Sequence, residues 1–173
     1  MKKLLLTCIL IFGFHFSHGQ TSPDVFDIAR KGTLEQAKEK LKENPNSFNV
    51  VNNEGYSPLI LAAYRGNNEV AKFLIESGSD INAKSSMGTP LMACIVKGNL
   101  EIAKTLIDKK ADVNFADANG NTALIYAVKF NNIEALKLLL KSNIDKKYVD
   151  KSGKTAFEHA VFAGNQEIIN LLK

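Results

Sequence analysis

The chain has 173 residues, of which 45% are hydrophobic and 23% are charged, and its formal net charge at pH 7 is +4. This composition is that of an ordinary globular protein, and it argues against a disordered or collagen-like chain. The net charge is too small to indicate a protein that binds nucleic acid or an anionic membrane.

Residues 1–19 have the order of a secretory signal peptide. Two lysines come first, a mostly apolar stretch follows over residues 4–16, and small residues precede an expected cleavage site before Gln20. This stretch is short for a membrane span, and no later stretch of the sequence is long and apolar enough to be one. A buried N-terminal helix is the alternative. We expect an exported protein, periplasmic or secreted, with no membrane insertion after cleavage of the signal.

A three-residue motif then recurs at intervals of 32 or 33 residues. The four copies are Ser57-Pro58-Leu59, Thr89-Pro90-Leu91, Thr122-Ala123-Leu124 and Thr155-Ala156-Phe157. Downstream of them, similar intervals separate four residues that are each followed by asparagine: Gly66, Gly98, Asn131 and Gly164. Self-similarity at such a period is typical of a repeat protein.

Each copy predicts a pair of short helices. A serine or threonine hydroxyl caps the first helix, and Gly66 and its counterparts end it, because they accept a left-handed backbone. The second helix begins after Asn67 and its counterparts, and it carries apolar residues at helical spacing. Gly78 and Asn143 fit the turn that ends the second helix, and Lys110 fits it less well.

Tight turns are predicted before the first helices, at residues 52–55, 117–120 and 150–153, each of which ends in glycine. Neither helix of a pair can bury its apolar face alone, so the pairs must stack side by side. The sequence therefore predicts a stack of helix pairs that share one continuous core.

This pattern resembles the ankyrin repeat. The residues that carry the resemblance are Thr89-Pro90-Leu91, Ala62-Ala63, Asp80-Ile81-Asn82 and Asp112-Val113-Asn114. It is strong over residues 52–173 and weak over residues 23–51, and the tetratricopeptide pattern fits much worse. The resemblance implies an all-α ankyrin-repeat solenoid of helix-turn-helix units with β-hairpin-like turns, in a domain of residues 23–173. About four clear repeats and a degenerate N-terminal one are expected, approximately at residues 23–51, 52–83, 84–116, 117–149 and 150–173.

The sequence departs from the family pattern in three ways. Other residues replace the family's histidine, so its hydrogen bonds between repeats are expected to be missing; they are Ile60, Met92, Ile125 and Glu158. The repeat that begins at residue 84 is one residue short and its turn glycine is displaced to Gly88, so we expect a bent turn. Because the chain stops at Lys173 inside the last helix, we expect four apolar residues to be partly exposed and to allow weak self-association: Ile168, Ile169, Leu171 and Leu172.

Reactive side chains are few. Beyond residues 1–19 the sequence has one histidine, His159, and one cysteine, Cys94. Cys94 lies in an apolar stretch, which favours a buried structural thiol, and a structural hydrogen bond is the favoured role for His159. The sequence has no zinc pattern, no Gly-rich phosphate loop and no Gly-x-Ser-x-Gly motif. We expect no catalytic residue, no cofactor and no metal, and hence not an enzyme.

The family resemblance implies that partners contact the turn tips and the exposed ends of the first helices. The candidate partner-binding residues at these positions are Tyr56, Tyr64, Arg65, Lys97, Asn119, Asn121, Lys129, Phe130, Lys154 and Phe162. Aromatic residues and arginine are enriched in binding hot spots, and the cations would favour an acidic partner surface. The alternative is that the aromatic residues pack on neighbouring repeats and the lysines only keep the surface hydrated.

The sequence is therefore expected to encode a non-enzymatic scaffold for protein–protein interaction, acting in the periplasm or outside the cell through its concave surface of turn tips and first helices. The expected partner is another protein, with no role for nucleic acid. Two alternatives remain open. One is an inhibitor or immunity-type protein that blocks a secreted enzyme or toxin, and the other is a self-assembling structural unit.

Overall fold

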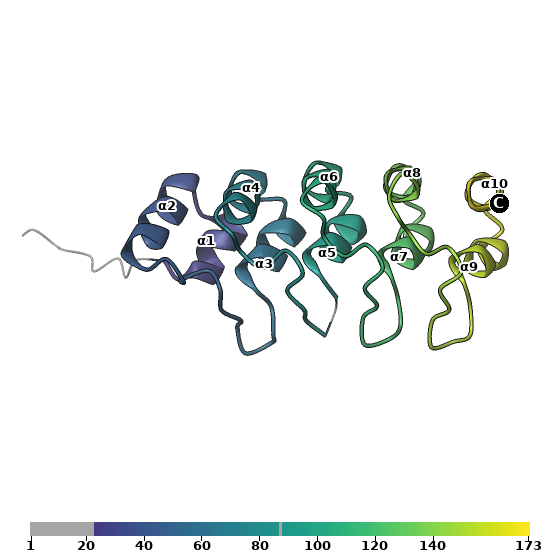
Figure 1. The fold of residues 1–173 in the computed structure, drawn as a ribbon, viewed down its shortest axis with the longest axis horizontal. Helices are drawn as coiled ribbons and strands as arrows, with labels where there is room; N and C mark the ends of the chain where they lie inside the picture. Colours follow the sequence, from purple (N-terminus) through teal and green to yellow (C-terminus); the bar gives the residue numbers. More distant parts are fainter. Residues whose placement is uncertain (1–22, 87) are drawn as a thin grey trace, which may run out of the picture.

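The computed structural model describes residues 23–86 and 88–173 (Figure 1). Within these residues the chain forms ten helices and no extended strand, only two isolated β-bridges. The first helices of the five pairs are α1 (Val25–Lys31), α3 (Pro58–Arg65), α5 (Pro90–Lys97), α7 (Ala123–Lys129) and α9 (Ala156–Ala163). The second helices are α2 (Leu34–Glu43), α4 (Asn68–Glu76), α6 (Leu100–Asp108), α8 (Ile133–Leu140) and α10 (Gln166–Leu172). The all-α solenoid predicted from the sequence is confirmed.

The helix pairs stand in a row, as Figure 1 shows. First helices form one layer, second helices form the other, and the turns that precede α3, α5, α7 and α9 project together from the first layer. Each of the five ranges predicted as repeats holds one of these pairs. The predicted signal peptide, residues 1–19, lies outside the described residues, and none of the described helices has the length and apolar character needed to cross a bilayer.

Local sequence explains where the first helices begin and end. The hydroxyl of Ser57 accepts a hydrogen bond from the N–H of Ile60 at 3.2 Å, and three threonines do the same at the starts of α5, α7 and α9. Each satisfies one of the N–H groups that a helix leaves free at its start. Gly66 ends α3 with a φ of 75°, and Asn131 follows α7 with a φ of 51°, as the sequence predicts.

An asparagine before each of α4, α6, α8 and α10 also joins neighbouring pairs. The side-chain N–H of Asn67 donates to the carbonyl oxygens of Ile28 and Gly32, at 3.3 and 2.9 Å. Asn132 donates in the same way to the carbonyl of Ile95 at 3.1 Å, while its oxygen caps α8 by accepting from Ala135 at 3.0 Å. One side chain therefore starts a helix and holds it to the preceding pair, in a fold whose first helices lack the family's histidine.

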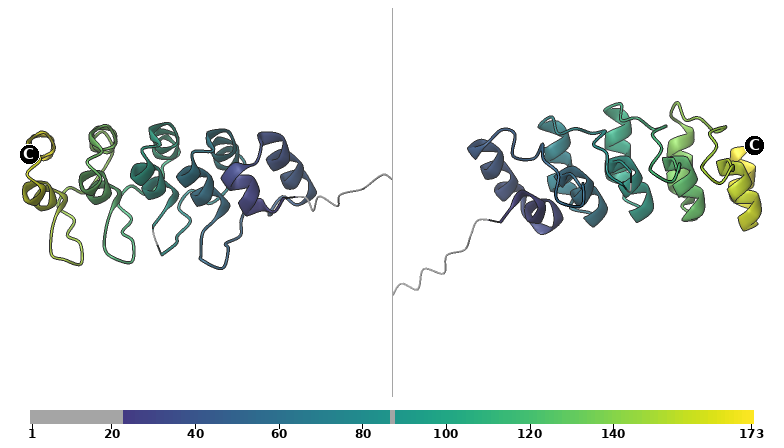
Figure 2. Two further views of the ribbon diagram at one scale, coloured as in Figure 1. Left: turned by 180° about the vertical axis from the view of Figure 1, so that it is seen from behind. Right: turned by 90° about the horizontal axis from the view of Figure 1, so that it is seen from below.

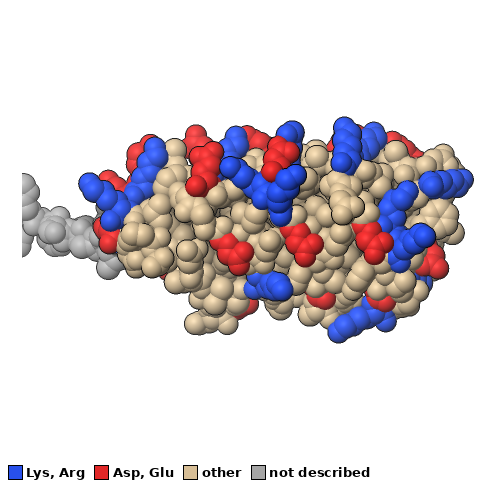
Figure 3. Space-filling view, viewed as in Figure 1, with Lys and Arg blue, Asp and Glu red and all other residues tan. Residues whose placement is uncertain are grey.

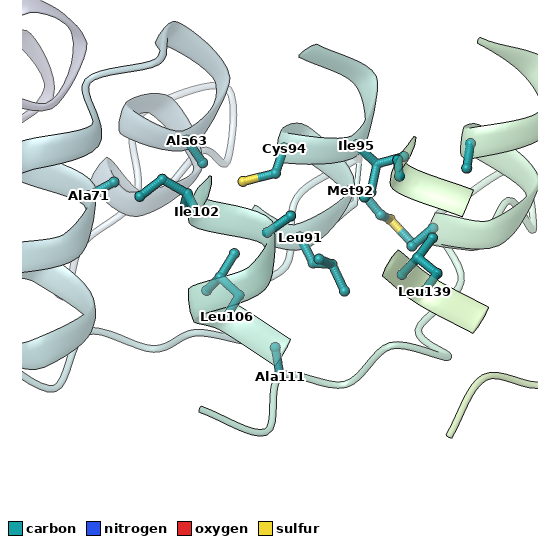
Figure 4. Close-up of a cluster of buried hydrophobic side chains, with 14 of the residues drawn as sticks. Ala63, Ala71, Leu91, Met92, Cys94, Ile95, Ile102, Leu106, Ala111 and Leu139 are labelled. Atoms are coloured by element: carbon teal, nitrogen blue, oxygen red, sulfur yellow. The ribbon is translucent and has the colours of Figure 1, made fainter. Parts of the chain in front are cut away.

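The core runs along the row between the two layers, and it consists of small and branched side chains (Figure 4). Leu59, Leu91 and Leu124 occupy equivalent positions, and each is 1% exposed. Ala62 and Ala63 are fully buried, and their small size lets α3 approach its neighbours α1 and α5 closely. Every pair thus buries its apolar face against the next one, which is why the units depend on stacking.

Tight turns of one design precede α3, α7 and α9. The side-chain oxygen of Asn52 accepts hydrogen bonds from the N–H groups of Glu54 and Tyr56, at 3.0 and 2.9 Å. Asp117 and Asp150 do the same in their own turns. The turn before α5 is shorter: Ser85 and Gly88 exchange two backbone hydrogen bonds, of 3.0 and 3.1 Å. Met87, the other residue of the displaced turn, lies outside the described residues.

The structure differs from expectation at the ends of two second helices, α6 and α8. Lys110, with a φ of 69°, adopts the left-handed conformation after α6, whereas Asn143 does not adopt it after α8. The reason lies in the backbone hydrogen bonds. After α6 the N–H of Ala111 donates to the carbonyl of Leu106, whereas after α8 the N–H of Ser142 donates to the carbonyl of Leu139.

The last helix also differs from expectation. Ile168 and Leu172 are buried, at 1% and 6% exposure, because α10 turns them toward α9 and α8. Ile169 and Leu171 are half-buried. The apolar surface exposed in this repeat belongs to α9, where Val161 is 52% and Phe162 is 84% exposed.

Candidate functional site

One groove lies on the side of the molecule where the turns project, which is the side that faces the viewer in the right-hand view of Figure 2. It has a volume of about 440 Å³ and is lined by side chains of α1, α3, α5 and α7 and of the two turns that precede α3 and α5. Its apolar wall comes from Ile60 and Val96 with the rings of Tyr56, Tyr64 and Phe130. We call this hollow the groove.

Four of the predicted partner-binding residues line the groove: Tyr56, Tyr64, Arg65 and Phe130. Tyr64 and Phe130 are 37% and 54% exposed, although both rings are large and apolar. A fifth residue, Lys97, stands at the rim, where its Nζ lies 4.7 Å from the centre of the Tyr64 ring. These five residues come from three consecutive repeats, and the stack brings them together.

Tyr126 is a residue of the groove that the sequence reasoning missed. Its ring lies 6.0 Å from that of Phe130, and its hydroxyl donates to Oδ2 of Asp117 at 2.5 Å. Burial, and then the neighbouring Asp117 carboxylate, raises the pKa of Tyr126 to about 12. The signal in the sequence is the spacing of four residues between Tyr126 and Phe130, which places two aromatic rings on one helix face.

The remaining predicted residues lie farther along the row. Asn119 is exposed at a turn tip, and Lys154 stacks its Nζ 5.0 Å from the centre of the exposed Phe162 ring. Asn121 does not lie on the accessible surface, contrary to the prediction, because it is only 7% exposed. Its side chain holds the turn together: the oxygen accepts from Nζ of Lys129 at 2.5 Å, and the nitrogen faces Asp117 at 3.5 Å.

The last turn contains a buried cluster of charged groups. Asp150 has a 3% exposed side chain, and its Oδ2 lies 2.8 Å from Nε2 of His159 and 3.5 Å from Nζ of Lys129. Burial would raise the pKa of Asp150, but hydrogen bonds from Ser152, His159 and the backbone outweigh burial and hold that pKa well below its usual range. His159 therefore makes the structural hydrogen bond predicted for it, within its own repeat.

The two layers differ in how their charges are arranged. In Figure 3 the charged residues gather along the upper edge, over the second helices, and are sparser along the lower edge, where the turns lie. The second helices neutralise much of their own charge, as in the pairs Lys104–Asp108 and Lys137–Glu134 and in the bridge from Lys72 on α4 to Glu101 on α6. Exposed pairs of this kind add little to stability, because water and salt screen them.

The first helices have the opposite arrangement. No acidic residue occurs in α3, α5 or α7, and these helices end in Arg65, Lys97 and Lys129. Lys129 pairs with Asp150, whereas Arg65 and Lys97 form no ion pair within residues 23–86 and 88–173. The groove therefore combines an apolar aromatic wall with a rim whose cations are not neutralised.

Cys94 lies away from the groove, in the core. It is fully buried, and burial raises the pKa of its thiol to about 12, so that it packs as an apolar side chain. Figure 4 shows it among Ala63, Ile102 and other buried side chains. Among the described residues, no group of three histidine, cysteine or acidic side chains is placed to hold a metal ion.

Comparison with known proteins finds a family model, described as "Ankyrin repeats (3 copies)", that matches residues 25–117 and 106–173. Over 65 residues, or 38% of the chain, 37% are identical to "Ankyrin repeat and SAM domain-containing protein 6" of Rattus norvegicus, of which they cover 7%. Over 59 residues, or 34% of the chain, 37% are identical to "DNA-binding protein RFXANK" of Homo sapiens, of which they cover 23%. "Palmitoyltransferase akr1" of Emericella nidulans is 36% identical over 61 residues, 35% of the chain and 8% of that protein. The chain thus matches less than a quarter of each relative's length.

Proposed function

The chain belongs to the ankyrin-repeat family, and from this premise we propose that it is a non-enzymatic scaffold that binds another protein through its groove and the adjoining turn tips. Ankyrin repeats generally mediate protein–protein interaction, so the family itself favours a protein partner. The observation that carries the proposal is the pair of exposed rings, Tyr64 and Phe130, beside Arg65, which forms no ion pair in the described part of the chain. Clusters of aromatic residues and arginine in a hollow are typical of binding hot spots.

Two observations favour a scaffold over an enzyme. His159 is held by the buried Asp150 in the last turn, and Cys94 is enclosed in the core with its thiol protonated, so that neither reaches the groove. Family members are generally non-enzymatic. One relative is named a palmitoyltransferase, but the similar region is 8% of that protein, and its activity is a property of the whole protein.

The proposal includes export, on the strength of residues 1–19. Expression of the full chain in a host with a secretory pathway, followed by mass spectrometry of the exported fraction, tests this part. A mature protein that begins at Gln20 is the expected product. Retention of the uncleaved chain inside the cell would contradict export and would leave the binding proposal untouched.

A capture experiment tests the binding. The full chain is immobilised and exposed to periplasmic and extracellular fractions of its source, in parallel with the double variant Tyr64→Ala/Phe130→Ala. The wild type should retain a protein partner, and the double variant should lose most of it, because truncation of a hot-spot residue costs about 2 kcal/mol or more. The matched control is Lys109→Ala/Lys141→Ala, at exposed ends of second helices. Equal retention by both double variants would sink the assignment of the surface.

Self-assembly is a second candidate, favoured by the exposed Val161 and Phe162 on α9. In that case the purified chain should change its mass in light scattering with concentration, and Phe162→Ser should abolish the change. An inhibitor that blocks a secreted enzyme or toxin would use the same groove as the scaffold, and the identity of the captured partner separates these two roles.

A further inference from the structure

The groove has two parts of different chemistry. Its wall is apolar and includes Ile60, at 4% exposure, and the more exposed rings of Tyr64 and Phe130. Its rim carries Arg65 and Lys97, at the ends of the neighbouring helices α3 and α5. We infer that the groove binds a segment of a partner protein in which one or two bulky apolar side chains lie close to carboxylates. This inference rests on the proposed function and names the chemistry of the partner.

The size of the groove sets the apolar part of the partner. Its volume of about 440 Å³ falls within the range of about 300–1,000 Å³ that sites for small ligands occupy. A hollow of this size accepts one or two large side chains of a partner, which a short segment can supply. The rings that line it offer broad apolar contact, and aromatic rings contribute more to such contacts than their area alone predicts.

The charge of the rim indicates the polar part of the partner segment. Lys97 lies over the ring of Tyr64, and Arg65 follows Tyr64 in the chain, so both cations border the apolar wall. Arg30, which lines the groove from α1, is paired with Asp27 at 3.4 Å, and Glu54 is the acidic residue among the lining side chains. A carboxylate of the partner would therefore meet Arg65 and Lys97 in preference to any other charge of the groove.

The positions of the two cations also indicate how far apart two carboxylates of the partner segment should lie. Packed helices lie about 8–10 Å apart, and an extended chain advances about 3.3 Å per residue. Successive side chains of an extended segment point to opposite faces, so two carboxylates two residues apart, about 7 Å along the chain, share a face and would reach the long side chains of Arg65 and Lys97 together. Both cations also sit favourably at helix C-termini. That role explains a positive charge at each position, but it does not explain the exposed rings beside them.

Selection from a display library of random dodecapeptides tests the inference. The baits are the full-length wild type, the charge-reversed variant Arg65→Glu/Lys97→Glu, and the matched control Lys109→Glu/Lys141→Glu. The control makes the same change of charge at the ends of second helices. Wild type and control should enrich peptides that combine bulky apolar residues with aspartate or glutamate, and the charge-reversed protein should not.

One enriched peptide is then synthesised with a fluorescent label and titrated by anisotropy. The variants Arg65→Glu/Lys97→Glu and Tyr64→Ala/Phe130→Ala should each weaken binding by about tenfold or more, whereas the control should stay within about twofold of wild type. Phe162→Ala, an exposed ring outside the groove, should also leave binding unchanged. Circular dichroism of each variant verifies the fold. If the charge-reversed variant is not folded, Arg65→Gln/Lys97→Gln replaces it.

Three results would overturn the inference. They are enrichment of peptides that lack carboxylates, equal binding of acidic peptides by the charge-reversed protein, and no enrichment of any peptide by the wild type. In each case the capture experiment with folded partners still decides the proposed function, because it does not depend on a short acidic segment.

Discussion

The Nε2 atom of His159 lies 2.8 Å from the Oδ2 atom of Asp150, a carboxylate whose side chain is 3% exposed. The preceding repeat has a tyrosine hydroxyl at the same place, that of Tyr126, which donates to Asp117. Both pairs fasten a turn to the first helix that follows it. Two different donors thus make the same connection around an aspartate at an equivalent position.

This relationship predicts a pH dependence of stability. The pKa of Asp150 lies below its ordinary value in the folded protein, so folding favours the carboxylate over the protonated acid. The corresponding stabilisation is present above the unfolded pKa of about 4, and it is lost as pH falls through the folded value. Asp150→Asn should therefore lower the urea midpoint at neutral pH, and its difference from wild type should shrink steadily as pH falls below about 4.

The control for this experiment is Glu39→Gln, which removes one exposed carboxylate from the middle of α2, away from both helix ends. Its urea midpoint should follow that of the wild type at every pH. A midpoint difference for Asp150→Asn that stays constant under acid conditions would show that the carboxylate charge does not stabilise the turn.

Gly120 provides a second prediction, because its position is crowded by the next turn. Its φ is 79°, and a Cβ atom there would lie 2.8 Å from the backbone nitrogen of Lys151. Gly55 and Gly153 have φ values of 82° and 77° in their own turns, but a Cβ atom would meet nothing within 4 Å. Alanine at Gly55 or Gly153 should cost about 1–2 kcal/mol for the left-handed backbone alone. Alanine at Gly120 should cost more, by about 1 kcal/mol or more, because backbone must move.

Urea unfolding of the three alanine variants measures these costs. The comparison is internal, since all three substitutions change the same residue type in the same turn position. Equal losses of unfolding free energy at the three sites would mean that adjacent turns do not press on each other.

Asn132 tests the connection between helix pairs. Asn132→Asp keeps an oxygen that can cap α8, and it places a negative charge at a helix start, where it is normally favourable. It replaces the N–H that donates to the carbonyl of Ile95 at 3.1 Å with an acceptor. We therefore expect destabilisation by about 1–3 kcal/mol, against the sign that capping alone predicts. The equivalent Asn165→Asp should be close to neutral in unfolding free energy, because its N–H donates to the exposed side chain of Asn131.

The buried thiol gives the fourth prediction. Because burial raises the pKa of Cys94 to about 12, iodoacetamide should not modify it in the folded protein at neutral pH. Mass spectrometry of the tryptic peptide of residues 85–97 should show the label only after addition of denaturant. Rapid labelling of this peptide in the native protein would show that α5 opens locally.

Sequence reasoning succeeded where structure depends on near neighbours. Ser57 as a helix cap, Gly66 as a left-handed residue and Asn52 at the start of a turn follow from residue type and spacing. The repeat also placed Tyr64 and Phe130 on one surface, because both lie at the exposed end of a first helix and these ends face the same way in stacked units.

Sequence reasoning failed where the contacts of a residue are made with residues outside its own local motif. Lys129, at the other end of α7, covers Asn121 and donates a hydrogen bond to its side-chain oxygen, and no local pattern predicts this. Lys110 takes a conformation that residue type disfavours, because Ala111 must close the helix end against Leu106. The orientation of α10, which buries Ile168, likewise depends on the contacts with α8 and α9.

The main contacts of each helix are with its own partner and with the adjacent pairs. A one-dimensional array of this kind opens from its two ends, since an end unit has a single neighbour to hold it. Amide deuterium exchange should then be slowest in the central pair, α5 and α6, and should accelerate outward in both directions. The groove extends from α1 to the fourth pair, so a bound ligand would slow exchange toward the N-terminal end of the row and would leave α9 and α10 to exchange as before.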